Sequence, residues 1–361
     1  MINKIKNIII KKNLDGYIVP KNDKFFTEYS KISNLELISN FSGSAGFAII
    51  LKNKNYLFVD GRYTLQAKKQ SGENFKILEI PLIWPKNIFK SFKNKLVIGF
   101  DPKLFTYNSL NHYFGNTCNL TPINEDLFYN KNSRESKINK FYKLDKKITG
   151  ESSKSKINRA VKILNKKKID YLFVSSGENV CWLMNIRGKD LPNSPVANCN
   201  IILTKNRKIY FFSKMRKISK IKNKLINQKI FFYEEEKLFE ILRSLKPGSF
   251  CIDKQTCSIF NEELINSKFI IKDRTDFIYY LKSIKNKTEI KNMMKAHIED
   301  GVALTKFLYW IKTLKKLNLT EQKVEKKLEN YRKESKNYLF PSFDTIAGSG
   351  PNGAIIHYRS N

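Results

Sequence analysis

Residues that could bind a substrate gather near the end of this chain, in positions 341–358. This segment predicts a turn rich in Gly, Pro and Asn that leads into a short apolar strand, 354–358, which carries His357. Glycines permit positive φ angles and would let a substrate backbone pass close to the turn. A histidine can move a proton near neutral pH, although a lone histidine at a strand end is more often structural.

The glycines of this turn formally match the G-x-G-x-x-G pattern, at Gly348, Gly350 and Gly353. That pattern binds dinucleotides only when a strand precedes it and a helix N-terminus follows it. Here a strand is expected to follow, and Pro351 removes an amide donor from the loop. We therefore interpret the segment as a tight turn and exclude a dinucleotide site.

A second candidate is Arg62, in the sequence DGRY at positions 60–63, which follows an expected hairpin at 48–58. An arginine held by a turn could bind a carboxylate or a backbone carbonyl of a ligand. Taken alone, the motif favours a surface arginine at the exit of a hairpin. His112 and His297 have no partner residues at metal-ligand spacing, so the residues themselves predict no metal site.

An internal repeat organises the first 280 or so positions. Residues 12–19 recur as 168–174, with Asp15 and Asp170 in equivalent places, and the expected hairpin at 48–58 recurs at 200–212. Each copy predicts a mixed α/β domain, with later strands at 97–101 and 250–253. Residues 130–155 are expected to be the linker between the two copies.

The region after residue 281 has a different pattern. Apolar residues recur at helical spacing from Thr288, the expected N-cap, to about residue 314, and a second helix is expected from Thr320. Two helices and one strand do not close a core, so this region resembles the beginning of a larger domain. We therefore predict an α/β (α+β) protein with three parts, 1–148, 149–281 and 282–361.

Composition narrows the class of protein. The net charge is +34, from 67 basic and 33 acidic residues, but the lysines are spread along the chain together with many Asn and Ile. The joint excess of Lys, Asn and Ile indicates codon bias in an AT-rich genome and not a selected binding surface. We therefore expect no specific nucleic-acid partner. Five cysteines without a CxxC pair predict free thiols. The absence of a signal peptide and of a long apolar run predicts a cytoplasmic protein without a membrane partner.

Five segments together resemble the three-domain, cytosolic-type Xaa-Pro aminopeptidases (aminopeptidase P). They are FSGSAG (41–46), DGRYTLQA (60–67), WLMNIRG (182–188), AHIEDGVAL (296–304) and FDTIAGSGPNGAIIHY (343–358). The resemblance follows the family's order and spacing along essentially the whole chain. It implies two similar creatinase-type N-terminal domains followed by the N-terminal part of a pita-bread catalytic domain.

The resemblance also implies a site and an activity, the removal of an N-terminal residue that precedes proline. In the family, two divalent metal ions, Mn²⁺ or Zn²⁺, activate a water molecule. The family's histidine falls on His357, which would be catalytic and would contact the substrate, and Arg62 would also bind substrate. The full-length family enzyme binds peptides with proline at the second position and can form a homodimer.

This chain departs from the family in one respect. The family's metal ligands follow the histidine, and none of them is present by residue 361. The expectation is therefore a family member truncated before its metal ligands, which binds no metal and is inactive as the isolated chain. A truncated gene product, an incomplete gene model and a split enzyme would each account for this. One alternative is a noncatalytic protein-interaction scaffold built from creatinase-type domains. A creatinase or prolidase is another, weakened by the doubled N-terminal domain.

Overall fold

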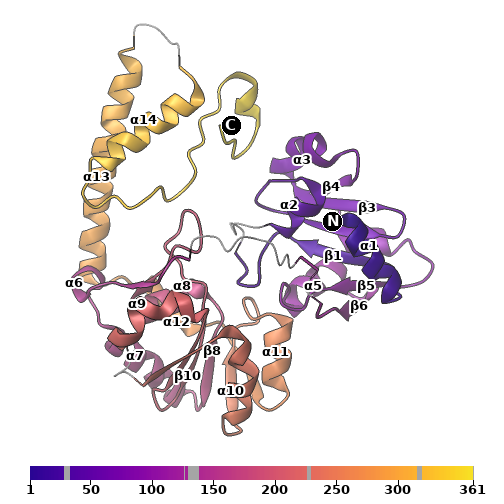
Figure 1. The fold of residues 1–361 in the computed structure, drawn as a ribbon, viewed down its shortest axis with the longest axis horizontal. Coiled ribbons are helices and arrows are strands. Elements are labelled where there is room, and N and C mark those ends of the chain that lie inside the picture. The colour runs from indigo at the N-terminus through magenta and orange to yellow at the C-terminus, as the bar shows by residue number, and fades with distance from the viewer. Residues whose placement is uncertain (28–32, 126, 129–137, 226–228, 315–318, 361) are drawn as a thin grey trace. The chain divides into compact units, whose positions relative to one another are not determined.

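The computed structural model describes residues 1–27, 33–125, 127–128, 138–225, 229–314 and 319–360. The chain forms two compact units (Figure 1). The N-terminal unit comprises Met1–Lys143 and Ser152–Ser283. The second, which we call the helical unit, comprises Leu144–Glu151 and Ile284–Asn361. A short piece of chain between the two α/β domains therefore belongs to the helical unit.

The first α/β domain is built on a six-stranded mixed sheet of order β4-β3-β2-β1-β5-β6. Strands β1 to β3 pair antiparallel, and the outer strands pair parallel. The strands are β1 (Gly16–Pro20), β2 (Phe47–Leu51), β3 (Asn55–Asp60), β4 (Lys76–Ile80), β5 (Leu96–Phe100) and β6 (Cys118–Pro122). Every residue of β1 and β2 is buried, as expected for strands with both faces covered.

Helices cover both faces of this sheet. One apolar cluster joins a face to α1, α2 and α3, and another joins the opposite face to α4 and α5. The helices are α1 (Ile2–Lys11), α2 (Asn34–Ser39), α3 (Thr64–Ser71), α4 (Pro85–Phe89) and α5 (Tyr107–Phe114), with a 3₁₀ turn η1 (Gly61–Tyr63). In α1 the buried residues are Ile5 and Ile9, one turn apart, so a single face is apolar.

The second domain repeats this architecture with the sheet order β12-β11-β10-β8-β13-β14. The strands are β8 (Tyr171–Val174), β10 (Asn200–Thr204), β11 (Ile209–Phe212), β12 (Ile230–Tyr233), β13 (Ser249–Ile252) and β14 (Ile270–Asp273). One face packs on α7 (Ser153–Lys166), α8 (Gly177–Met184), α9 (Met215–Leu225) and α12 (Phe277–Ser283). The other packs on α10 (Leu238–Ser244) and α11 (Ile259–Asn266), which follow the 3₁₀ turn η3 (Glu235–Lys237).

The duplication predicted from the sequence is confirmed by the contacts of its two aspartates. Asp15 Oδ2 accepts a hydrogen bond from Val97 N at 2.9 Å and ties β1 to the parallel strand β5. Asp170 Oδ2 accepts from Ser249 N at 2.8 Å and ties β8 to the parallel strand β13. The two carboxylates thus lie at equivalent points of two sheets with the same strand order.

The region expected to be a linker is partly structured. Residues 130–137 lie outside the described residues, but β7 (Tyr142–Lys143) pairs with β9 (Ile186–Arg187), and α6 (Lys146–Thr149) follows. Helix α7 then begins at Ser153 with Ser152 as its N-cap. The prediction of a linker extending to residue 155 was therefore wrong, because local capping and strand pairing order this stretch.

The helical unit has two long helices, α13 (Lys287–Lys312) and α14 (Glu321–Lys333). They are joined by ion pairs, among them Arg332 Nε to Asp300 Oδ1 at 2.6 Å. The N-cap of α13 is Asn286, not the predicted Thr288, because Asn286 and Glu289 form a reciprocal capping box. Thr320 caps α14 as predicted.

Residues 354–358 do not form the predicted strand. They follow the 3₁₀ turn η4 (Gly350–Ala354) and continue as a turn, in which Tyr358 N donates to Ile355 O at 3.2 Å. A strand needs a neighbouring backbone to satisfy its polar groups. Among the described residues of the helical unit no strand supplies one, so the backbone forms local hydrogen bonds instead.

Candidate functional site

Arg62 lies on η1, directly after β3, and is held by the aspartate that caps this turn. Asp60 Oδ1 accepts from Arg62 N and Nε, each at 3.0 Å, and Asp60 Oδ2 accepts from Nη2 at 2.7 Å. The guanidinium also lies over the ring of Tyr63, 5.3 Å from its centroid. Two donors of the guanidinium are therefore committed to Asp60, and the side chain is 52% exposed.

The FSGSAG segment packs beside this arginine turn. Ser44 Oγ and Tyr63 OH share a hydrogen bond of 2.7 Å, and the rings of Phe41 and Tyr63 meet edge to face at 5.8 Å. A Cβ on Gly46, whose φ is +151°, would lie 2.7 Å from Phe58 O. Two motifs that are far apart in the sequence thus build one corner of the first domain, with Arg62 at its surface.

His357 lies in the turn that follows η4. Its backbone φ is 54°, in the left-handed region that non-glycine residues rarely adopt. Its half-buried ring meets the ring of Phe343 at 6.1 Å between centroids, in an edge-to-face arrangement. The histidine is thus oriented by an aromatic neighbour and an uncommon backbone conformation. Such conformations are frequent at functional sites but do not assign a function.

Glu321, at the start of α14, holds the glycine-rich turn in place. Its carboxylate accepts from Ser349 N at 2.5 Å and from Asn352 Nδ2 at 3.0 Å. The Ser349 amide is the main reason why the pKa of Glu321 is lowered. The same carboxylate accepts from the hydroxyl of Tyr358, and this hydrogen bond raises the pKa of that phenol. The carboxylate of Glu321 thus joins the start of α14 to this turn.

Arg62 belongs to the N-terminal unit and His357 to the helical unit. The sequence singled out both residues but gave no sign of Asp60 or Glu321 as their supports. Asp60 could have been found as a capping residue two positions before the arginine, where its carboxylate can reach the backbone amide. Glu321 is far from His357 in the sequence, and nothing in the sequence pattern connects the two.

A metal centre does not fit the described residues. No group of three or more His, Cys, Asp or Glu side chains among them could hold a metal ion. All five cysteines are free and buried, as predicted, and burial raises the pKa of Cys118 to about 12 and that of Cys181 to about 11. Thiolate ligands are therefore disfavoured at these positions.

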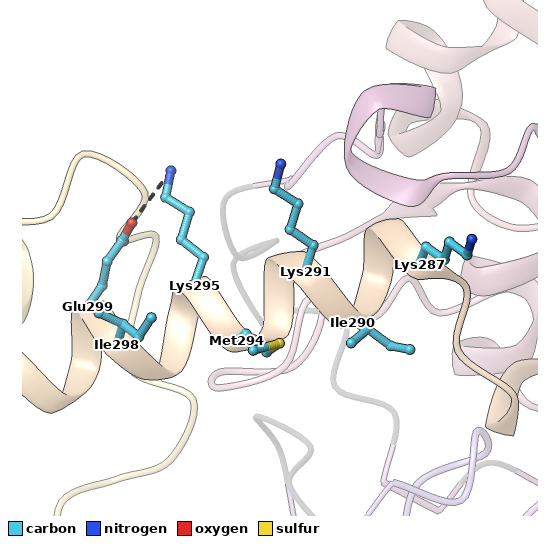
Figure 2. A pocket seen from close by; sticks show the side chains of 7 residues that line it. All are labelled: Lys287, Ile290, Lys291, Met294, Lys295, Ile298 and Glu299. Carbon is cyan, nitrogen blue, oxygen red and sulfur yellow. Dashed lines mark ion pairs between the residues drawn. The ribbon is translucent and has the colours of Figure 1, made fainter.

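The helical unit also carries a shallow hollow along α13. Figure 2 shows its lining, which combines apolar side chains with the stems of lysines: Lys287, Ile290, Lys291, Met294, Lys295, Ile298 and Glu299. Met294 is 63% exposed and Ile298 is 67% exposed, and Ala303 is the only buried residue of the helix. This face offers an apolar surface without catalytic groups.

Comparison with known proteins places these features in a family. The Creatinase/Prolidase N-terminal domain matches residues 1–127 and again residues 132–289. Metallopeptidase family M24 matches residues 291–361. A probable Xaa-Pro aminopeptidase P of Laccaria bicolor is 30% identical over 99% of this chain and 58% of its own length. The chain is therefore a relative of the Xaa-Pro aminopeptidases, with two creatinase-type N-terminal domains and a segment of metallopeptidase family M24.

Other family members support the assignment. Xaa-Pro aminopeptidase 1 of Dictyostelium discoideum is 30% identical over 99% of this chain and 61% of its own length. The crystal structure of X-prolyl aminopeptidase from Caenorhabditis elegans shares the fold, with a TM-score of 0.86 and 24% identity over 96% of this chain and 60% of that one. This chain thus spans about three fifths of the length of these relatives.

Proposed function

We propose that this chain acts in the removal of an N-terminal residue that precedes proline. The main support for this proposal is the match over 99% of the chain to relatives named Xaa-Pro aminopeptidase. The order of two creatinase-type domains followed by an M24 segment agrees with it. In this proposal, peptides with proline at the second position are the substrates. His357 contacts the peptide near the scissile bond, and the exposed side chain of Arg62 binds the substrate.

The metal requirement belongs to the complete enzyme. The C. elegans relative is described as a cytosolic enzyme with a di-nuclear active site. We extend both properties to the complete form of this protein, with two Mn²⁺ or Zn²⁺ ions and a homodimeric state. Because the described residues hold no ligand cluster, we propose that these 361 residues alone bind no metal and turn over no peptide.

The test compares this chain with a chimaera. The chimaera joins residues 1–361 to the remaining segment of the Dictyostelium discoideum relative. After dialysis with Mn²⁺, the chain alone should retain no stoichiometric metal and should leave an Xaa-Pro tripeptide intact. The chimaera should retain metal and cleave the peptide. Turnover by the repurified chain alone would refute the proposal that these residues are inactive by themselves, and an inactive chimaera that binds metal would refute the peptidase assignment.

Two histidine variants of the chimaera test the site. His357→Ala should lower kcat without removing the metal, because His357 is proposed to contact the substrate and not the metal. His297→Ala, on the exposed surface of α13, is the matched control and should leave kcat unchanged. Equal effects of both substitutions would show that His357 has no special role.

A noncatalytic interaction scaffold remains the second candidate. The exposed apolar face of α13 favours it, because extended apolar patches of this kind are typical of protein-binding surfaces. If the chimaera cleaves an Xaa-Pro peptide and the 361-residue chain does not, a scaffold role is possible only for the 361-residue chain.

A further inference from the structure

Helices α7 and α9 carry an unusual charge distribution. The sequence of α7, SKSKINRAVKILNK, has five basic residues and no acidic one, and that of α9, MRKISKIKNKL, also has five and none. Basic residues outnumber acidic ones about two to one in the whole chain, with 67 against 33. At that ratio, ten basic residues would be accompanied by about five acidic ones. The acidic residues are thus excluded from these two helices.

The fold places both helices on one side of the molecule's second sheet. Their apolar residues, such as Ile157 and Leu164 of α7 and Ile218 and Ile221 of α9, join the same buried cluster on one face of the sheet. The opposite stripe of each helix therefore faces solvent. It carries the exposed residues Lys154, Lys162 and Lys166 of α7, and Arg216, Lys220 and Lys222 of α9.

The other face of the same sheet has the opposite character. Helix α10 has one acidic and one basic residue, Glu240 and Arg243, and α11 has two acidic residues, Glu262 and Glu263, with no basic one. An excess of lysine caused only by base composition would raise the charge of both faces alike. The difference in charge between the two faces of this sheet therefore indicates a selected property of the folded surface. It is not apparent from the linear sequence.

The basic stripe carries an energetic cost within the protein. Lys162 and Lys166 are one helical turn apart, and like charges at this spacing destabilise a helix. Within the part of the chain that the structure describes, neither lysine forms an ion pair, and neither do Lys220 and Lys222. A polyanion bound along the stripe would relieve this repulsion and release counterions.

The lack of exposed apolar side chains on α7 and α9 indicates which class of polyanion could bind there. None of the large apolar side chains exposed in the described residues belongs to α7 or α9. Insertion into a membrane needs apolar residues beside the basic ones, and single-stranded nucleic acid is bound through exposed aromatic rings. Both are disfavoured. A duplex, whose bases are stacked inside and whose phosphates are outside, needs only cationic contacts.

We propose that the exposed face of α7 and α9 binds the phosphate backbone of duplex nucleic acid, without base specificity. The contacts come from the lysines at 154, 162, 166, 220 and 222 and from Arg216. This interaction does not depend on the peptidase activity, because it uses a face of the second domain that carries neither Arg62 nor His357. It also revises the expectation that the high charge reflects composition alone.

The test uses the full chain and a fluorescent DNA duplex of about 20 base pairs, long enough to span several phosphate contacts. Binding is followed by anisotropy over a series of salt concentrations. The variant Lys162→Gln, Lys166→Gln, Lys220→Gln and Lys222→Gln keeps helix-forming side chains but removes four charges. It should bind at least about tenfold more weakly, and the slope of log K against log salt should become less steep by up to about 3.6.

The matched control removes four charges elsewhere, through Lys68→Gln, Lys69→Gln, Lys90→Gln and Lys93→Gln on the first domain, all exposed in the structure. It should bind within about twofold of the unmodified chain, since net charge alone acts weakly through salt screening. Duplexes of different sequence should bind equally. Equal losses in both variants, no duplex binding, or binding to anionic vesicles in place of the duplex would overturn the proposal. Circular dichroism confirms that both variants are folded.

Discussion

Asp276 is a buried carboxylate at the start of α12, where burial in the second domain raises its pKa to about 6. Its Oδ1 accepts from Ile278 N at 2.9 Å, and its Oδ2 accepts from Asn179 Nδ2 at 2.8 Å. Asn179 Oδ1 is buried without a hydrogen-bond partner among the described residues. The folded protein therefore holds the proton of Asp276 more tightly than the unfolded chain does.

This difference predicts a stability that falls as the pH rises. Between the ordinary pKa of 3.8 and the folded value of about 6, the folded state binds more protons than the unfolded state. The stabilisation is thus fully present below about pH 4 and is lost by about pH 6. A shift of this size corresponds to on the order of 3 kcal/mol in the free energy of unfolding.

The substitution Asp276→Asn should remove this part of the pH dependence. The amide oxygen of the introduced side chain can still accept from Ile278 N, and a flipped Asn179 amide can turn its unpartnered oxygen toward the new NH₂ group. The variant should therefore be more stable than the original chain near pH 7.5 and similar near pH 4. Urea unfolding at both pH values measures the difference. Asp273→Asn, on the exposed end of β14, is the control and should leave the pH dependence unchanged.

At the scale of elements, Gly150 caps the end of α6 and packs against the first turn of α13. Its φ is +72°, and a Cβ there would lie 2.3 Å from Asn286 Oδ1 and 2.8 Å from Thr288 Cβ. Asn286 Nδ2 donates to Thr149 O at 2.9 Å, so α6 docks on the N-cap of α13. Only a residue without a side chain fits between these two elements in a left-handed conformation.

Gly150→Ala should weaken this docking by about 1–3 kcal/mol, because both the backbone conformation and the contact with Asn286 become unfavourable. Amide exchange in the first turns of α13 should accelerate. Gly301→Ala offers an opposite control, since Gly301 lies inside α13 with nothing within 4 Å of a Cβ. It should stabilise the helix by about 0.5–1 kcal/mol. Unchanged exchange in the first turns of α13 in Gly150→Ala would show that the docking of α6 does not control this end of the helix.

The sequence predicted elements wherever local information determines them. The steps at Asp15 and Asp170 located β1 and β8, and Thr320 located the start of α14, because these signals lie within a few residues of their effect. The strand at 354–358 failed because a strand depends on a neighbour that sequence periodicity does not supply. The basic face of α7 and α9 was missed because its members are far apart in the sequence and meet only through the sheet.

At the scale of the whole molecule, the two units differ in how much of each is buried. Clusters of fully buried residues cover both sheets of the N-terminal unit, whereas α13 buries one residue and α14 buries none. Opening of a segment costs less when fewer apolar contacts hold it. We expect amides in the helical unit to exchange faster than those in the strands of the N-terminal unit.

Hydrogen exchange followed by mass spectrometry of the intact chain measures this difference, with peptides from β1 and β8 as internal references. In the chimaera with the complete M24 segment, exchange along α13 should slow, since its exposed apolar face would become covered. Protection of α13 equal to that of β1 in the chain alone would show that the helical unit is complete without further residues.

The candidate site was predictable only in part at this scale. The resemblance to the family's motifs identified Arg62 and His357, whereas the residues alone favoured structural roles for both. Their roles stay predictions because each needs a bound peptide to be tested. The capping position of Asp60, two residues before Arg62, could have indicated the clamp on this arginine, whereas nothing in the sequence pattern connects Glu321 with the turn before His357. The contact with Glu321 arises from three-dimensional packing, in which residues distant in sequence come together.

The assignment of Leu144–Glu151 to the helical unit has a consequence for how such genes recombine. A crossover at the boundary after Ser283 would exchange α13 and α14 but leave α6 and Gly150 with the other parent. The incoming α13 would then meet a foreign partner at its first turn. Recombinants that retain function should therefore inherit Leu144–Glu151 together with the C-terminal part. Insertions between the two α/β domains should be tolerated before residue 144 and not within these eight residues.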